Sequence, residues 1–449
     1  MIWGADNDLT EAIVMARSAS TDARKAFVET YGRMSRRTRR LDRLGVPAAE
    51  SRSAMGEAIS QASDTVTAAI AAEIARLNDL RQEVVSAAAM SSFPPAVVAT
   101  ADTLRVPEVV SAEHHQLTGD FNAYGDDNTR TDTWTGSDST YAVELPDGRT
   151  AWIVSDTFLG TVEADGSRRD DTDLVPNAIV IQDGKTFTTL VGGTAEEPRG
   201  LLDLSELGWP NGRVAWAGAT QIHDGTLEVL YRVHEWSDGW HYGNVIATFD
   251  LDDLRRAPVV RPLDVSQGVL WGSAVHRHGG YTYVYGTEDR HDVKYLQVAR
   301  IEGDSLTGSW EFLTDDGTWS ADDRDAHRRL AGVANEFSVT PMGDAFLLVT
   351  HDTTQPYGAD IVGFVAPTPY GPFVDKTVLY TTPETGADGV YGDPGLYTYN
   401  AQAHPHIARD PNHLMVSYSV HGTTAEGPSE LVLTDVSVYR PRFVTIEFG

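Results

Sequence analysis

The feature that most constrains this chain of 449 residues is a pattern that occurs five times after residue 130. Each copy has a short polar motif, a strand, a turn with glycine, aspartate or asparagine, and a second apolar strand. The copies are residues 136–156, 216–234, 271–289, 335–352 and 399–421. Hairpins repeated in this way are typical of propeller blades, which surround a central polar pocket. The sequence therefore predicts a mainly β fold with a five-bladed β-propeller over residues 118–449.

The first copy shows how the pattern encodes a hairpin. Tyr141 and Val143 alternate with other residues along one strand, and Trp152 and Val154 do so along the next. The tripeptide at 146–148, Pro-Asp-Gly, supplies a turn between them. The polar motifs start near residues 138, 218, 272, 336 and 402, a spacing that fits one four-stranded blade each.

The N-terminal part has a different, helical periodicity. Residues 6–43 and 48–90 are predicted to form helices, separated by Gly45 and Pro47. Apolar residues of the second helix follow heptad spacing, which favours packing against the first helix in a helical hairpin or against other copies of the chain in a coiled coil. The predicted domains are a helical stalk at 1–95, a linker at 96–117 and the propeller at 118–449. A basic run at 33–43 is interpreted as a solvated helix face or as a docking surface for an acidic protein.

Charge and composition exclude several classes of protein. The first 95 residues carry equal numbers of basic and acidic residues, so the net charge of −30 belongs to the remainder. Such an acidic domain repels nucleic acid. The absence of cysteine excludes disulfides and thiolate sites, and no apolar run reaches the ~20 residues of a membrane span. The N-terminus also lacks the pattern of a signal peptide.

Residues at equivalent positions of the repeats should meet around the propeller axis. This places Asp138, Asp156 and Glu336 together as candidate catalytic groups. Paired carboxyl groups around a polar pocket are what glycoside hydrolysis requires, because one donates a proton while the other activates water or attacks. In this hypothesis Asp138 and Asp156 form the acid/base pair, and Glu336 modulates their pKa or is an alternative acid. The structural alternatives are a turn-capping role for either aspartate and a salt bridge for Glu336.

A second set of residues is predicted to bind the substrate. Its members are Trp271, Asn335, Tyr399, Asn400 and His404. The aromatic rings, with Tyr357, suit stacking on sugars, although aromatic residues in propellers also pack between blades. His404 has a buried, hydrogen-bonding role as its alternative, and the small Gly218 and Gly272 should leave room beside the pocket. No nucleophile elbow, zinc motif, phosphate loop or EF-hand occurs, so neither a metal nor another cofactor is predicted.

Four segments carry a resemblance to a known family. The stretches 134–160 (WTGSDSTYAVELPDGRTAWIVSDTFLG), 270–286, 335–339 and 399–407 (YNAQAHPHI) resemble the propeller domains of the endo-D-arabinanase family. The resemblance covers about residues 118–449, and its first and last motifs are the specific ones. It implies cleavage of the D-arabinan of mycobacterial arabinogalactan and lipoarabinomannan, with Asp138 and Asp156 catalytic and with Asn400 and His404 lining the pocket. Ser137 stands where a second glycine is common.

A helical stalk before such a head resembles a minor tail protein of a phage of actinobacteria. That resemblance implies a location on the virion tail. It also implies that the second helix joins the stalk into a homotrimer or docks it on the tail tip, with contacts to other tail proteins through the N-terminal helices. Three functions remain open from the sequence: a tail-borne glycosidase, a non-catalytic glycan-binding protein that recognises the envelope, and a structural decoration of the tail.

Overall fold

The computed structural model describes residues 104–449, apart from residues 170–171, 211, 236–240, 266–267, 290–292, 409, 411 and 425–426. The predicted stalk at 1–95 and the first part of the predicted linker lie outside the described residues.

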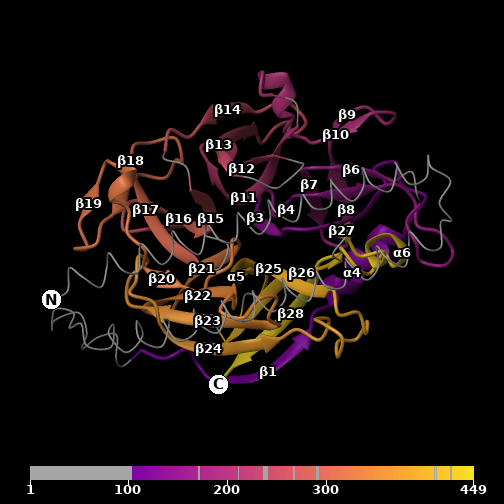
Figure 1. The fold of residues 1–449 in the computed structure, drawn as a ribbon. Helices are drawn as coiled ribbons and strands as arrows, with labels where there is room; N and C mark the ends of the chain where they lie inside the picture. The colour runs from indigo at the N-terminus through magenta and orange to yellow at the C-terminus, as the bar shows by residue number, and fades with distance from the viewer. Residues whose placement is uncertain are drawn as a thin grey trace, which may run out of the picture. The chain divides into compact units, whose positions relative to one another are not determined.

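Five antiparallel sheets, each with four principal strands, form the described part of the chain (Figure 1). Blade I consists of β3 (Tyr141–Glu144), β4 (Thr150–Val154), β7 (Ala178–Asp183) and β8 (Thr186–Leu190). Blade II consists of β11 (Arg213–His223), β12 (Thr226–Glu235), β13 (His241–Asp250) and β14 (Val259–Pro262). Blade III consists of β15 (Val269–His278), β16 (Tyr281–Asp289), β17 (Lys294–Glu302) and β18 (Trp310–Leu313), extended by β19 (Trp319–Ser320) and β20 (Leu330–Ala331). Blade IV consists of β21 (Phe337–Met342), β22 (Ala345–His351), β23 (Asp360–Ala366) and β24 (Val374–Thr381). Blade V consists of β25 (Leu396–Ala403), β26 (His413–Thr424), β28 (Arg442–Phe448) and β1 (Val109–His114), with β27 (Gly427–Pro428) paired to β26.

Short elements connect and cover the blades. A small sheet contains β2 (Trp134–Ser137), β5 (Thr157–Leu159) and β6 (Asp173–Val175), and a two-stranded ribbon contains β9 (Gly192–Gly193) and β10 (Pro198–Arg199). The helices are α4 (Gln116–Asp126), α5 (Pro405–Ala408) and α6 (Leu431–Thr434), with the 3-10 turns η1 (Leu204–Leu207) and η2 (Asp323–Asp325).

The first strand of each sheet lies innermost and contacts the first strand of the next sheet. These contacts run from β3 to β11, β15, β21 and β25 in turn. The predicted hairpin repeats are therefore the inner two strands of the five blades. This arrangement confirms a mainly β, propeller-like fold for the described residues.

Local sequence accounts for the inner hairpin of blade I. Gly148 has a φ of 87°, which favours glycine, and the Leu145 N–H donates to the Arg149 carbonyl at 2.7 Å. The Asp147 side chain accepts from the Arg149 N–H at 3.1 Å and fixes the turn. The predicted strands and turn are thus confirmed, and Tyr141 is placed at the start of the inner strand.

Apolar side chains fill each seam between neighbouring blades. Representative buried pairs are Ile153 and Val229 for blades I and II, Leu230 and Val284 for II and III, Tyr285 and Phe337 for III and IV, Leu347 and Val416 for IV and V, and Trp152 and Phe443 for V and I. Full burial of such a side chain contributes about 1.5–3 kcal/mol. Because the strand ladders do not run from one blade to the next, this packing of apolar side chains holds neighbouring blades together.

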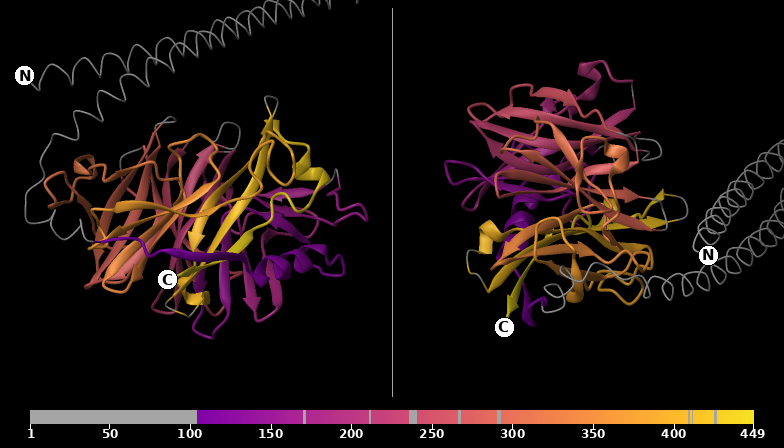
Figure 2. Two further views of the ribbon diagram at one scale, coloured as in Figure 1. Left: turned by 90° about the horizontal axis from the view of Figure 1, so that it is seen from below. Right: turned by 90° about the vertical axis from the view of Figure 1, so that its left-hand side faces the viewer.

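The two ends of the described chain close the ring together. Strand β1 pairs with β28 along the outer edge of blade V, where the indigo and yellow ends meet (Figure 2). Helix α4 follows and inserts Phe121 into the seam between blades V and I, against Trp134, Trp152 and Phe443. The assignment of residues 109–117 to a linker is therefore wrong. Local pattern did not reveal this strand, because its pairing partner lies more than 300 residues away.

Gly218 and Gly272 do not open space beside the pocket, contrary to prediction. They occupy bulges of β11 and β15 where the backbones of blades II and III touch. A Cβ on Gly218 would lie 2.7 Å from the Leu230 carbonyl oxygen and 2.8 Å from that of Gly272. Their small size serves close backbone packing.

Candidate active site

Asp138 and Asp156 lie side by side at the end of the propeller where the inner strands begin. The Asp138 N–H donates to the Asp156 carbonyl at 3.2 Å, and the Ser155 N–H donates to the Asp138 carbonyl at 3.0 Å. The sequence pattern produces this pairing, because one residue precedes β3 and the other follows β4 in the same hairpin. Both side chains are half-buried.

Tyrosine hydroxyl groups surround the Asp138 carboxyl. The Tyr399 hydroxyl donates to Asp138 Oδ2 at 2.7 Å, and Tyr439 also forms a hydrogen bond with this side chain. Burial raises the pKa of Asp138 to about 6, and the negative charge of Glu336 acts in the same direction. The tyrosine hydrogen bonds lower this pKa, because they stabilise the ionised form, but they do not cancel the effect of burial.

Asp156 has fewer hydrogen-bond donors. Burial and, after it, the charge of Asp138 raise the pKa of Asp156 well above its ordinary value. The indole N–H of Trp216 opposes this by donating to Asp156 Oδ1 at 2.8 Å. The Trp216 ring in turn lies against His234, with 4.3 Å between ring centroids. Blade II thereby orients a carboxyl group of blade I.

Glu336 is fixed by a buried cation. Its Oε1 lies 2.9 Å from Arg232 Nη1, and Arg232 also donates to the Tyr141 hydroxyl and to the Ala217 carbonyl. Oriented to satisfy both neighbours, the Asn400 amide donates to Glu336 Oε2 at 2.6 Å and accepts from Ser139. Removal of one partner from a buried ion pair costs about 3–5 kcal/mol, because the other charge is left buried without a counter-ion.

The backbone around Asp138 is unusual. Ser139, Asn400 and Tyr439 have φ values of 52°, 59° and 71°, in the left-handed region that side chains disfavour. Each such residue costs about 1–3 kcal/mol, and such residues cluster at active sites. Here Ser139 donates to the Asn400 side chain, and Tyr439 forms a hydrogen bond with Asp138. These contacts help to hold the three residues in this conformation.

The structure thus brings five predicted residues together: Asp138, Asp156, Glu336, Tyr399 and Asn400. Two carboxyl groups have raised pKa values and a third is ion-paired. Such a set can both donate and accept a proton near neutral pH.

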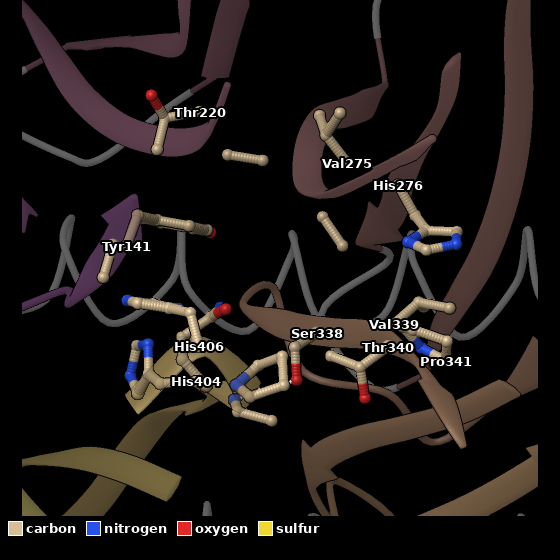
Figure 3. A pocket seen from close by; sticks show the side chains of 16 residues that line it. Tyr141, Thr220, Val275, His276, Ser338, Val339, Thr340, Pro341, His404 and His406 are labelled. Atoms are coloured by element: carbon tan, nitrogen blue, oxygen red, sulfur yellow. Dashed lines mark hydrogen bonds between the residues drawn. The ribbon is translucent and has the colours of Figure 1, made fainter. Parts of the chain in front are cut away.

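His404 lies farther along the axis, in a cavity of about 200 Å³ between the inner strands (Figure 3). Tyr141, His276 and His406 also line this cavity, whereas the three carboxylates do not. His404 is buried, its Nε2 lies 2.7 Å from Ser417 Oγ, and burial holds its pKa well below the ordinary value. Its placement agrees with the alternative of a buried hydrogen-bonding residue rather than a substrate contact beside the carboxylates.

Two other predictions of substrate contact disagree with the structure. Trp271 is 1% exposed, and its ring packs on Trp310 and Phe312 in the seam between blades II and III. Trp271 therefore cannot stack on a sugar, because neighbouring side chains already cover its ring. Asn335 turns its side chain away from the carboxylates and donates to Asp289 Oδ2 at 3.0 Å, while its carbonyl accepts from Arg232.

Sequence reasoning missed four residues of the site: Tyr141, Trp216, Arg232 and Tyr439. An arginine inside the apolar strand LEVLYRVH was a usable signal, since a buried cation needs a partner. Trp216 opens the second repeat, where the polar motif was expected. Nothing local marks Tyr439, which comes from the connection between α6 and β28.

The described residues contain neither a metal-binding cluster nor a membrane-spanning helix. Within them, no group of three histidine, aspartate or glutamate side chains is arranged to hold a metal ion. None of the helices in the same part of the chain is both long and apolar enough to cross a bilayer.

The fold and the site define a β-propeller with an acidic centre at the start of its inner strands. Residues 119–448 match the family described as a domain of unknown function, DUF5005, and the chain belongs to that family. Its structure is similar to that of a candidate hydrolase from Bacteroides ovatus, with a TM-score of 0.60 and 20% identity over 80% of this chain and 97% of the other. A GH43_1 enzyme from Xanthomonas citri, solved with xylotriose, has a TM-score of 0.43 and 15% identity over 74% of this chain and 93% of its own. No curated protein matches the sequence.

Proposed function

We propose that this protein is a glycoside hydrolase. The observation that carries the proposal is the pair of adjacent aspartates, Asp138 and Asp156, whose pKa values are both raised beside a third, ion-paired carboxylate. Two carboxyl groups in different protonation states are the machinery of glycosidic bond cleavage. The shared fold with a candidate hydrolase from Bacteroides ovatus supports the proposal.

The surroundings of the two aspartates support a different role for each. Asp156 has one hydrogen-bond donor and a strongly raised pKa, so it keeps a proton and donates it to the leaving oxygen. Asp138 has two tyrosine donors and a pKa of about 6, so it is ionised near neutral pH and activates water or attacks the anomeric carbon. Glu336, ion-paired with Arg232, keeps a negative charge near Asp138 and thereby raises the pKa of Asp138.

The proposed substrate is the D-arabinan of a mycobacterial-type cell envelope. The resemblance of residues 134–160 and 399–407 to endo-D-arabinanases supports this choice. Both segments contribute to the site, through Asp138 and Asp156 from the first and through Tyr399 and Asn400 from the last. A neutral polyol also suits an acidic protein, which repels anionic polymers.

We further propose that the protein acts on the tail of a phage, as a minor tail protein. This part rests on the sequence of residues 1–95, with its helical periodicity and balanced charge. In that setting the helices would associate as a trimer and contact other tail proteins.

Incubation with purified arabinogalactan, followed by chromatography of the products, tests the enzymatic proposal. Release of arabino-oligosaccharides by the wild type, lost in Asp156→Asn, supports it. Saturable binding to the polymer without release would instead identify a glycan-binding protein. If the protein neither binds the polymer nor releases oligosaccharides from it, the substrate assignment is overturned.

A further inference from the structure

A short loop of blade IV lies at the carboxylate end of the propeller. Glu336 immediately precedes β21, and β22 runs back toward it, so the loop that follows β22 returns to the same end. Backbone bonds fix this loop at both ends. The Asp352 N–H donates to the Asp360 carbonyl at 2.9 Å, and the Thr353 N–H donates to the Gly332 carbonyl at 3.1 Å.

The loop presents Tyr357 in a conformation that tyrosine disfavours. Its φ is 53°, where glycine or asparagine is the ordinary choice, and its side chain is 67% exposed. An exposed ring contributes little burial to offset this conformation. A strained backbone that holds a large exposed ring beside a polar site is a pattern associated with ligand binding.

Three tyrosine rings connect this loop to the catalytic carboxyl. The ring centroid of Tyr357 lies 4.7 Å from that of Tyr397, which lies 5.5 Å from that of Tyr399. The Tyr399 hydroxyl donates to Asp138, and the charge of Asp138 helps burial to raise the pKa of Tyr397. The rings therefore form a continuous row from solvent to the reacting groups, called here the tyrosine row.

We propose that Tyr357 and Tyr397 form an outer subsite that binds a further sugar ring of the polysaccharide whose linkage lies at Asp138 and Asp156. This inference rests on the proposed function and adds that the enzyme recognises a chain, not a single sugar. Tyrosine suits such a subsite, because its face packs on the C–H groups of a sugar and its ring is rigid. In this subsite the face of the Tyr357 ring supplies the contact, beside the ring of Tyr397.

Binding of D-arabinan oligosaccharides, from disaccharide to octasaccharide, tests the subsite. Calorimetry is performed in an Asp156→Asn background, so that the oligosaccharides stay intact, and kcat/KM is measured in the otherwise wild-type protein. Tyr357→Ala should raise Kd roughly three- to tenfold for the longer oligosaccharides and leave the disaccharide unchanged. Tyr357→Phe should behave as the wild type, and Val259→Ala, at a 60% exposed position in the outermost strand β14 of blade II, is the control.

Tyr357→Gly separates binding from stability. Glycine accepts a φ of 53°, so the melting temperature should not fall, while the affinity for long oligosaccharides should fall as in Tyr357→Ala. Equal affinity of Tyr357→Ala and the wild type at every length, in a protein that binds the glycan, would overturn the subsite alone. Failure of the wild type to bind any of the oligosaccharides would overturn the subsite together with the proposed substrate.

Discussion

The seam between blades II and III and the seam between blades V and I use the same backbone device for different purposes. Bulges interrupt β11, β15 and β25 at corresponding places. At the first seam the bulges contain Gly218 and Gly272, whose backbones touch. At the second seam the bulge contains Asn400, which bonds to Ser139 and Glu336 next to the candidate catalytic aspartates.

The comparison indicates that the seam between blades II and III contributes to the stability of the fold, whereas the seam between blades V and I contains the candidate active site. The seam of Gly218 and Gly272 is apolar and close-packed, and the candidate catalytic groups lie outside it. The other seam keeps two carboxyl groups whose pKa values are raised, together with left-handed backbone at Ser139, Asn400 and Tyr439. Four variants test this division.

The largest effect should follow removal of Asp156, the proposed proton donor. Asp156→Asn should lower kcat about 10²–10⁴-fold, because asparagine cannot transfer a proton to the leaving group. Hydrolysis of arabinogalactan, measured as reducing ends, checks this. Asp165→Asn, in an exposed turn of the same region, is the matched control and should keep full activity. Unchanged kcat in Asp156→Asn would remove Asp156 from the mechanism.

At the seam between blades II and III, a substitution should change the stability of the fold rather than the activity. Gly272 has a φ of 95°, and a Cβ there would lie 2.7 Å from the Leu230 Cβ. Gly272→Ala should therefore lower the free energy of unfolding by about 2–4 kcal/mol, through both overpacking and backbone strain. Gly280→Ala is the control, since it has a φ of 83° and open space around it. Equal losses in the two variants, by urea denaturation, would mean that the seam is not tightly packed.

The seam between blades V and I should become more stable when the negative charge of Asp138 is removed. The folded pKa of Asp138, about 6, exceeds its ordinary value of 3.8, so its ionisation opposes folding as pH rises through this interval. Asp138→Asn should therefore raise the free energy of unfolding at about pH 7, by up to about 3 kcal/mol, and change it little near pH 3.5. Asp147→Asn is a contrast, because the Arg149 hydrogen bond lowers the pKa of Asp147. A gain that is independent of pH would rule out the electrostatic explanation.

The smallest effect should come from the residue that positions Asp156. Trp216→Phe keeps an aromatic ring but removes the donor to Asp156 Oδ1, which further raises the pKa of Asp156. The alkaline limb of the pH–kcat/KM profile should move to higher pH, and kcat should fall roughly three- to tenfold. Trp310→Phe loses an indole hydrogen bond to a backbone carbonyl away from the carboxylates and should leave the profile unchanged. A lower kcat with an unmoved limb would indicate a packing role only.

Much of the inner architecture could be predicted because it is encoded locally. Alternation and turn residues identified the inner hairpin at Tyr141–Glu144 and Thr150–Val154, and with it the pairing of Asp138 and Asp156. Trp271 was misassigned because alternation does not distinguish a ring that faces the axis from one that faces a seam. Arg232 and Tyr439 were missed because their partners come from other blades.

The sequence by itself determined the repeated hairpins, the acidic side chains at their starts and the turns between them, since each depends on residues a few positions apart. Only the tertiary structure decided that β1 closes blade V, that His404 lies in a separate axial cavity, and that burial raises the pKa values of Asp138 and Asp156. These properties depend on burial and on charges brought together from distant segments, and a linear pattern does not contain either quantity.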